Sequence, residues 1–384
     1  MPFGLFKPSA PMRVQPFYGY RTATHIHLTA RALRSKPSRF DSSTLIGGFR
    51  TMLREYISHE VGGVEVTLTF TTGDGRVVRG TEITDGEGFA RFAVPFGDAY
   101  DLPMATGWER ATLNWDGVPD RYDAGESHAH ILVPGRSAGI GIISDIDDTI
   151  LETGITGGFR AISRNWRRVM AQMPSQRAIV PGATDFYGAL GGGPVSAGET
   201  VDPDPKTHVP KARPRPIFYV SSSPWNLFNY LVAFKRSRGM PLGPIALRDW
   251  GLNRDTFGSG SHGAHKTDAI RRIVSGYPDL KFALVGDDTQ RDLIAFGEIV
   301  SEMPERIAAV FIRRIAEDLP NSEEQAAQKL IEAAGVPFWM GEDYGAARAF
   351  LEQAGLDMDA EVEELVKTAS EGQDAAAKPA TSEA

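Results

Sequence analysis

The chain has 384 residues, of which 41% are hydrophobic and 23% are charged, as expected for a folded protein of about two domains. Its formal net charge of −8 argues against a general nucleic-acid-binding protein, and no nucleic-acid partner is expected. The absence of cysteine excludes disulfides and thiolate metal sites and fits a cytoplasmic location. The sequence has no run of about 18 apolar residues, so no transmembrane segment is expected and any membrane contact would be peripheral.

The first third of the chain predicts short β-strands. Residues 1–20 contain four prolines and are predicted to form an irregular lead-in. Apolar and polar side chains alternate over residues 64–70, as in a strand with one buried face, and the sequences at 73–75 and 85–88 are typical of turns. Further strands are predicted at residues 24–32, 89–94, 112–115 and 128–133, while residues 43–60 fit a short helix or a loop. We therefore expect an antiparallel β-sandwich domain over residues 21–135.

Two His-x-His pairs lie in this region, at His25 and His27 and at His128 and His130. On a strand each pair would place both rings on one face, which is a geometry that a metal site can use. Histidines that face solvent are commoner on strands, and no sequence feature brings the two pairs together. We therefore predict no metal at these histidines.

From residue 136 onward the pattern changes to strands that alternate with helices, which is typical of a parallel sheet in an α/β domain. Strands are predicted at residues 140–144, 217–220, 245–247, 281–285, 308–312 and 337–340. Helices are predicted at residues 159–173, 184–190, 225–236, 267–275, 292–302 and 322–334, and residues 191–216 are expected to form a long loop. The sequence thus predicts an α/β domain over 136–350, followed by a C-terminal helix and a disordered tail over 351–384.

Polar side chains follow the buried strands of this second domain. The apolar run 140–144 ends in three carboxylates, Asp145, Asp147 and Asp148. Two carboxylates ~5 Å apart repel by roughly 3 kcal/mol at an effective dielectric of ~20, so this cluster requires a cation, a shared proton or a wet position. Ligands of open parallel sheets bind at the carboxyl ends of the strands. The other polar residues expected near this edge are Ser221, Ser222, Ser223, Lys266, Asp287, Asp288 and Asp292.

Each of these residues also has a structural explanation. Ser223 before Pro224 has the pattern of a helix start, and Asp287, Asp288 and Asp292 suit the N-terminus of a helix dipole. Lys266 is harder to explain in this way, because a cation just before a helix opposes that dipole. Their joint arrival at one edge of one sheet favours a functional site.

The motifs carry a family resemblance. Asp145-x-Asp147-x-Thr149, Ser221, Lys266 and Gly286-Asp287…Asp292 resemble, in order and strand context, the four motifs of the haloacid dehalogenase superfamily. The longer strings at 144–154, 219–227 and 247–250 resemble the actin-patch-protein type of phosphatidate phosphatase, a relative of the lipin catalytic domain. The resemblance covers residues 136–320 and implies a Rossmann-like haloacid dehalogenase domain. Asp288 departs from the pattern, since a small hydroxyl residue is expected there.

The resemblance also implies roles for individual residues. Asp145 would be the nucleophile that forms an aspartyl-phosphate, and Asp147 would be the acid and base of the two half-reactions. Mg²⁺ would be held by Asp145, the Asp147 carbonyl group and Asp287, with Asp288 or Asp292 directly or through water. Ser221 and Lys266 would bind the transferring phosphoryl group. The remaining predicted substrate-binding residues are Thr149, Ser222 and Arg248.

The function implied is Mg²⁺-dependent hydrolysis of phosphatidate to diacylglycerol and phosphate at a membrane surface. The amphipathic stretch 159–173, with four arginines, fits either a basic interfacial helix or a helix packed on its own domain. Nothing in the residues themselves requires a lipid, so a phosphatase of soluble phosphomonoesters is the alternative. A third hypothesis is an inactive module that binds a lipid or a partner, against which the intact set of Asp145, Asp147, Ser221, Lys266 and Asp287 argues.

Overall fold

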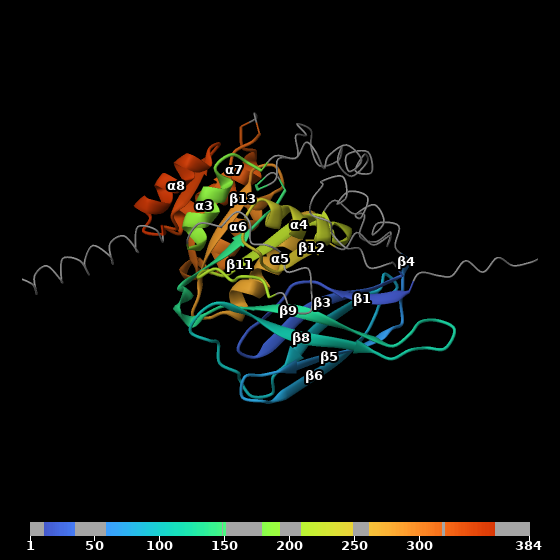
Figure 1. Cartoon of the computed structure of the whole chain (residues 1–384). Coiled ribbons are helices and arrows are strands. Elements are labelled where there is room, and N and C mark those ends of the chain that lie inside the picture. Colours follow the sequence, from blue (N-terminus) through green and yellow to red (C-terminus); the bar gives the residue numbers. More distant parts are fainter. Residues whose placement is uncertain are drawn as a thin grey trace, which may run out of the picture.

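A computed structural model of the protein describes residues 11–34, 59–147, 149–150, 179–192, 209–248, 261–316 and 319–357. These residues form two sheets, one mainly antiparallel and one parallel, with helices packed on the parallel sheet (Figure 1). The predictions for residues 43–58, for the helix at 159–173 and for the tail beyond residue 357 concern segments outside the described residues. The same holds for residues 193–208 of the predicted loop.

The first sheet has nine strands: β1 (Met12–Pro16), β2 (Gly19–Arg21), β3 (His25–Arg34), β4 (His59–Glu60), β5 (Glu65–Thr71), β6 (Val77–Ile83), β7 (Phe89–Pro95), β8 (Gly107–Trp115) and β9 (Gly125–Val133). Their order is β1-β3-β2-β9-β8-β5-β6, with β4 and β7 also paired to β3. The pairings are antiparallel except for the parallel pair β2 and β9. The predicted antiparallel arrangement of this region is therefore confirmed.

Alternation along the strands builds the core of this sheet. In β5 the side chains of Val66, Leu68 and Phe70 are buried, as the sequence pattern predicts, and they join a cluster with residues of β3, β7, β8 and β9. The sheet curls so that β6 approaches β7. The approach is close, since a Cβ added to Gly80 of β6 would lie 2.3 Å from a methyl group of Val94 of β7. The predicted turn at 73–75 joins β5 to β6, and Gly75 has a φ of 86°, which favours glycine.

The N-terminal segment differs from the prediction of an irregular lead-in. Residues 12–16 form β1, which pairs with β3 over Met12↔Arg34 to Pro16↔Ala30. Residues 19–21 form β2, which pairs with residues 26–27 of β3. The prolines misled the prediction because proline is tolerated at strand ends and on edge strands, and β1 stands at the end of the strand order.

The second sheet consists of six parallel strands: β10 (Ile140–Ser144), β11 (Ile217–Pro224), β12 (Ile245–Arg248), β13 (Lys281–Asp287), β14 (Ile307–Arg313) and β15 (Phe338–Gly341). Their order is β12-β11-β10-β13-β14-β15, which confirms the predicted parallel sheet. The first strand, β10, lies in the middle, and four of its five residues are buried. Its uninterrupted apolar run reflects burial on both faces.

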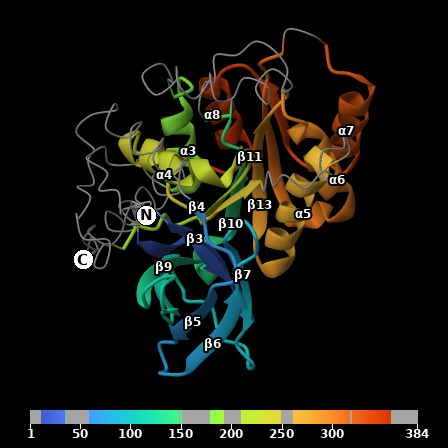
Figure 2. The same cartoon turned by 90° about the vertical axis from the view of Figure 1, so that its right-hand side faces the viewer.

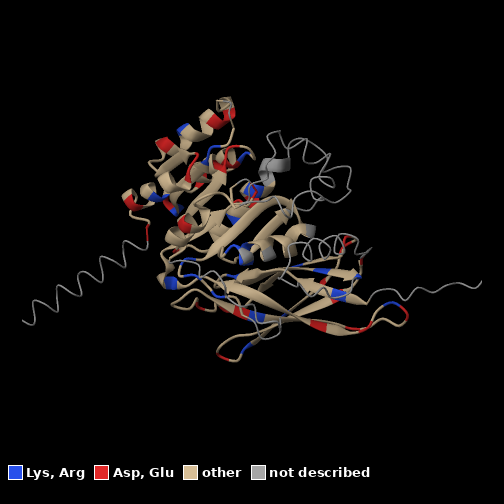
Figure 3. Cartoon of the chain, turned by 45° about the horizontal axis from the view of Figure 1, so that its top comes forward, with Lys and Arg blue, Asp and Glu red and all other residues tan. Residues whose placement is uncertain are grey.

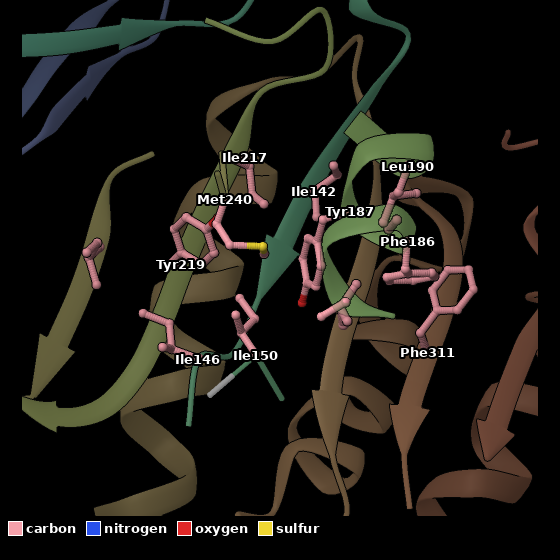
Figure 4. Close-up of a cluster of buried hydrophobic side chains, with 14 of the residues drawn as sticks. Ile142, Ile146, Ile150, Phe186, Tyr187, Leu190, Ile217, Tyr219, Met240 and Phe311 are labelled. Carbon is pink, nitrogen blue, oxygen red and sulfur yellow. The ribbon is translucent and has the colours of Figure 1, made fainter. Parts of the chain in front are cut away.

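Helices cover both faces of the parallel sheet (Figure 2). On one face lie α3 (Ala183–Gly191), α4 (Phe228–Ser237) and α8 (Tyr344–Gln353). Figure 4 shows part of this apolar layer, in which Ile142 and Tyr219 of the sheet pack near Tyr187 of α3. On the opposite face lie α5 (Ser261–Gly276), α6 (Asp292–Glu302) and α7 (Ser322–Ala333). No described helix has the length and apolarity needed to cross a membrane.

Several elements extend beyond their predicted bounds. Strand β11 continues to Pro224, and α5 begins at Ser261 rather than at residue 267, so that Lys266 lies inside the helix and not before it. Helix α8 was not predicted as a separate element. Figure 3 shows that Lys and Arg are interspersed with Asp and Glu over the described residues and do not form one continuous basic face.

Candidate active site

The nucleophile candidate follows directly from the central strand β10. The Asp145 backbone N–H donates to the Val285 carbonyl oxygen (2.8 Å), which extends the pairing of β10 with β13 by one residue. Ile146 and Ile150 are fully buried in the apolar core, on the layer drawn in Figure 4. Because these isoleucines fix the chain after the strand, Asp145 and Asp147 are held at the carboxyl edge of the sheet.

Lys266 reaches this edge from helix α5. It shares one helical face with Ala269, Ile270 and Ile273, and all four side chains are buried against the sheet. The Lys266 ammonium group donates to Asp145 Oδ1 (2.8 Å) and to Asp292 Oδ1 (2.5 Å). Burial works to lower the pKa of Lys266, but the carboxylates of Asp145 and Asp292 outweigh it and raise that pKa.

Asp145, Asp287 and Asp292 form a buried acidic group. One carboxylate oxygen from each lies within 4.8 Å of the others. Asp292 Oδ2 also accepts a hydrogen bond from the Asp287 backbone N–H (3.2 Å). This approach requires glycine at position 286, because a Cβ there would lie 2.7 Å from the Asp292 Cβ.

The environment of this group favours protons or a cation. Burial, reinforced by the Asp292 carboxylate, raises the pKa of Asp287 to about 7. Burial likewise raises the pKa of Asp145 and of Asp292, although Lys266 acts in the opposite direction on both. A divalent cation bound by oxygen ligands would stabilise the ionised carboxylates.

Asp147 is held by two serines from the end of β11. Ser221 Oγ and Ser223 Oγ both donate to Asp147 Oδ2, at 2.8 and 2.7 Å. The Ser223 backbone N–H in turn donates to Ser221 Oγ (2.9 Å). Ser223 was interpreted from sequence as the start of a helix, yet neither the following 3-10 turn nor α4 has a side-chain cap. Its hydroxyl group belongs to the site instead.

The site is stabilised by hydrogen bonds from the predicted residue Thr149 and from three residues that the sequence analysis does not single out, Thr289, Gln290 and Tyr344. Thr149, which was predicted, donates to Asp145 Oδ2 (3.3 Å) and to Asp287 Oδ2 (3.2 Å). The Thr289 hydroxyl and backbone N–H both contact Asp287 Oδ1, and the Gln290 side-chain amide donates to the Asp147 carbonyl oxygen (3.0 Å). Tyr344 donates to the Thr149 carbonyl oxygen (2.8 Å). Thr289 and Gln290 follow β13 directly, so the strand-end rule could have identified them, whereas Tyr344 comes from a distant helix.

The structure does not bring every predicted residue into the group. The Asp288 carboxylate accepts hydrogen bonds from the Ile315 and Ala316 backbone N–H groups, so its contacts are with the segment after β14 and not with the other acids. Ser222 is buried beside Ser221 in the same strand, and Arg248 is the last residue of β12, paired with Pro224. Asp148 lies outside the described residues. Asp288 and Asp292 are the two predicted alternatives for the metal site. The geometry favours Asp292, because its carboxylate lies beside those of Asp145 and Asp287.

The fold and the site together define an α/β protein with a buried acidic centre at the carboxyl edge of its parallel sheet. Residues 140–314 match a protein family described as "Phosphatidate phosphatase APP1, catalytic domain". This segment begins with β10 and ends just after β14, so it contains Asp145, Asp147, Ser221, Lys266, Asp287 and Asp292. The resemblance seen in the motifs, to the APP1 type of phosphatidate phosphatase, is thus confirmed.

Two curated relatives match about half of the chain. Phosphatidate phosphatase APP1 of Saccharomyces cerevisiae is 31% identical over 195 residues, which is 50% of this chain and 29% of the yeast protein. An uncharacterized protein of Schizosaccharomyces pombe is 28% identical over 182 residues, covering 47% of this chain and 26% of the relative. The match therefore spans less than a third of either relative's length. Among solved structures, a minor pilin, PilB, from Streptococcus sanguinis is aligned over 76% of this chain and 86% of its own, at 9% identity and a TM-score of 0.25, too low to inform the fold.

Proposed function

We propose that the protein is a Mg²⁺-dependent phosphatidate phosphatase, which hydrolyses phosphatidate to diacylglycerol and phosphate through an aspartyl-phosphate. The observation that carries this proposal is the convergence of Asp145, Asp147, Ser221 and Lys266 at one strand edge, within the segment that matches the phosphatidate phosphatase family. The protein would act in the cytoplasm and meet its substrate at a membrane surface.

The fold supports the superfamily assignment. Numbered by their order in the chain, the parallel strands run 3-2-1-4-5-6, which is the strand order of doubly wound Rossmann-type sheets. We propose that residues 136–350 form a haloacid dehalogenase-like catalytic domain. Residues 21–135 would form a β-sandwich domain that arises from the curling of the nine-stranded sheet, with residues 351–384 as a C-terminal extension.

The first half-reaction transfers the phosphoryl group to the protein. A carboxylate oxygen of Asp145 attacks phosphorus while the bond from phosphorus to the ester oxygen breaks. Asp147 gives a proton to the departing alkoxide, which leaves as diacylglycerol. Ser221 and Lys266 stabilise the charge on the transferring group.

The second half-reaction releases phosphate. Asp147, now a carboxylate, takes a proton from a water molecule as the water oxygen attacks phosphorus. The bond between phosphorus and the Asp145 oxygen breaks, so that inorganic phosphate leaves and both carboxyl groups return to their starting states. Ser223, through its 2.7 Å hydrogen bond, would hold Asp147 between the two transfers.

The residues present fit a divalent metal ion. Asp145, Asp287 and Asp292 offer only oxygen ligands, which Mg²⁺ prefers, and among the described residues one ammonium group, that of Lys266, pairs with Asp145 and Asp292. Asp145, Asp287 and Asp292 would hold the ion, with the Asp147 carbonyl group as the predicted fourth ligand. When bound, Mg²⁺ would neutralise charge on the phosphoryl oxygens. Thr149 and Thr289 would orient the carboxylates through their hydrogen bonds.

The lipid part of the proposal has a different basis from the chemistry. It comes from the printed names of the family and of the yeast relative, whereas the site itself fits any phosphomonoester. Ser222 and Arg248 stand at the ends of neighbouring strands and are proposed to contact the substrate beyond its phosphoryl group.

The test measures phosphate release from phosphatidate in mixed micelles and from a panel of soluble phosphomonoesters, with Mg²⁺ and with EDTA. Wild-type protein should prefer phosphatidate and require the metal, and Asp145→Asn should abolish turnover. Asp268→Asn, the same chemical change at an exposed position of α5, is the matched control and should retain full activity. Full activity of Asp145→Asn would refute the nucleophile, and preference for the soluble panel would refute the lipid substrate.

A further inference from the structure

The end of β11, which carries the two site serines, is not held by the parallel sheet alone. The pairing of β11 with β12 is regular at Tyr219↔Ile245 and Val220↔Ala246, then shifts its register before Pro224↔Arg248. Residues 221–223 lie in this irregular stretch, and after Pro224 the chain enters a 3-10 turn that begins at Trp225. Because the ladder is interrupted here, the position of the serines depends on what fixes the segment after them.

Aromatic side chains of the N-terminal sheet contact this segment. The Trp225 ring lies with its centroid 4.5 Å from that of Phe17, between β1 and β2, and 5.8 Å from that of Phe89 at the start of β7. Phe17 also meets Phe228, at the start of α4, edge to face at 4.7 Å. Phe17 and Phe89 are 4% and 2% exposed, so they belong to the core of the α/β domain although they come from the other sheet.

Hydrogen bonds keep Phe17 and its neighbours in place. The Phe17 backbone N–H donates to the Thr29 carbonyl oxygen (2.9 Å), which anchors the break between β1 and β2 to β3. On either side of it, Gln15 donates to the Asn229 side-chain oxygen (2.8 Å), and the Tyr18 hydroxyl accepts from Arg236 (3.1 Å). The contact therefore joins the N-terminal sheet to α4 at several points and is centred on Phe17.

We propose that Phe17 is a positioning residue for the proposed phosphatase reaction. Through Trp225, it holds residues 221–225 in the conformation in which Ser221 and Ser223 both donate to Asp147. The N-terminal sheet is thus a part of the catalytic unit, although it lies outside the matched segment 140–314. This inference deepens the proposed function and rests on it for the identity of the reaction.

The geometry explains why a distant ring would matter. Both serine hydroxyls converge on one oxygen, Asp147 Oδ2, at 2.8 and 2.7 Å, and hydrogen bonds of this kind weaken steeply once distance or angle departs from the optimum. A misplacement of about 1 Å in a catalytic constellation costs about 10²-fold in rate. Loss of the Phe17 ring would let Trp225 and the end of β11 shift toward the emptied space.

The experiment compares Phe17→Leu with Phe70→Leu. Phe70 is 2% exposed in the same N-terminal sheet but belongs to the separate core of that sheet, so its variant reports loss of sheet stability without loss of the contact. We expect kcat for phosphatidate to fall about tenfold in Phe17→Leu, with KM changed by less than about threefold. The fall should be smaller for p-nitrophenyl phosphate, whose leaving group needs little help from the acid Asp147. Phe70→Leu should keep kcat for both substrates.

An NMR measurement and a pair of substitute variants complete the test. In protein labelled with ¹⁵N-serine, Phe17→Leu should shift the amide resonances of Ser221 and Ser223, and Phe70→Leu should leave them unchanged. If Phe17→Leu does not fold, Trp225→Leu and Trp225→Phe replace it, with the loss expected only for Leu.

Unchanged serine resonances in a folded Phe17→Leu protein would overturn the inference whether or not the protein is a phosphatase. Equal activity losses in Phe17→Leu and Phe70→Leu would overturn it as well. Absence of turnover in the wild type would instead refute the proposed function, and the resonances would still decide the positioning role.

Discussion

Replacing Lys266 by Met should convert the acidic site into a source of instability that metal ions relieve. Lys266 is 2% exposed and is the described cation that contacts Asp145 and Asp292, at 2.8 and 2.5 Å. Met fills a similar volume without charge, so packing against Ala269 and Ile270 is retained. The substitution therefore isolates the electrostatic contribution of the ammonium group.

The expected loss is large because three carboxylates would be left buried without their counter-charge. Removing one partner of a buried ion pair costs about 3–5 kcal/mol, and here one partner serves two carboxylates. A metal ion that binds only the folded protein returns about 2.7 kcal/mol at 100 times its Kd. Saturating Mg²⁺ should consequently recover about half of the lost free energy of unfolding, while phosphate release falls by about 10²–10³-fold.

Urea unfolding measured with EDTA and with Mg²⁺ gives these free energies directly. Lys281→Met, at an exposed position of the neighbouring strand β13, is the control and should change stability by less than about 0.5 kcal/mol. If Lys266→Met were as stable as wild type in EDTA, the carboxylates would not depend on Lys266 for their charge balance. If Mg²⁺ stabilised neither Lys266→Met nor Lys281→Met, the assignment of the metal site would be wrong.

Two other predictions concern groups that the structure singles out. Ser223→Ala removes the 2.7 Å hydrogen bond to Asp147, so kcat, measured by phosphate release, should fall about tenfold more for alkyl phosphates than for aryl phosphates. Equal losses for the two kinds of substrate would contradict the role of Ser223 in holding Asp147. Lys235 is fully buried, its ammonium nitrogen has no hydrogen-bond partner within the described residues, and it lies 3.5 Å from the Tyr219 ring centroid. Burial lowers the pKa of Lys235 well below its usual value, so Lys235→Met should stabilise the fold by about 1–4 kcal/mol at pH 7. With its pKa lowered in the fold, Lys235 binds more protons in the unfolded chain than in the folded protein, so the stability of the wild type rises with pH up to the unfolded pKa of 10.5. In urea titrations the stability advantage of Lys235→Met should therefore shrink between pH 7 and 9.5. A stability difference that stays constant over this range would mean that the Lys235 amine stays charged in the fold.

The convergence of these candidate residues could be predicted because each of them stands at the end of an apolar run. Asp145 after β10, Ser221 in β11 and Asp287 at the end of β13 all stand where buried strands become polar, and parallel pairing then brings them to one edge. Asp292 could be placed from its helical spacing. The choice between Asp288 and Asp292 could not be made from sequence, because both are acids near one strand end and only the backbone decides which one turns inward.

The support of the site was harder to predict. Ser223 has the pattern of a helix cap, and its partner Asp147 lies 76 residues earlier in the chain. Phe17 stands in a segment rich in proline, where β-strand pairing depends on edge position rather than on local preference. Such contacts join elements far apart in sequence, and no local periodicity reports them.

The central position of β10 explains why this site needs contributions from so many segments. Strands β11 and β13 flank β10 on its two sides, so Asp145 stands between the serines of β11 and the carboxylates of Asp287 and Asp292. Helix α5 supplies Lys266 from the layer that also contains α6 and α7, while the N-terminal sheet contacts the segment after the two serines through Trp225. Local sequence motifs therefore supply the groups that we propose to react, and the separation between these groups is set by elements on both sides of the sheet. Substitutions in those outer elements should alter the rate of the proposed reaction without touching any reacting atom.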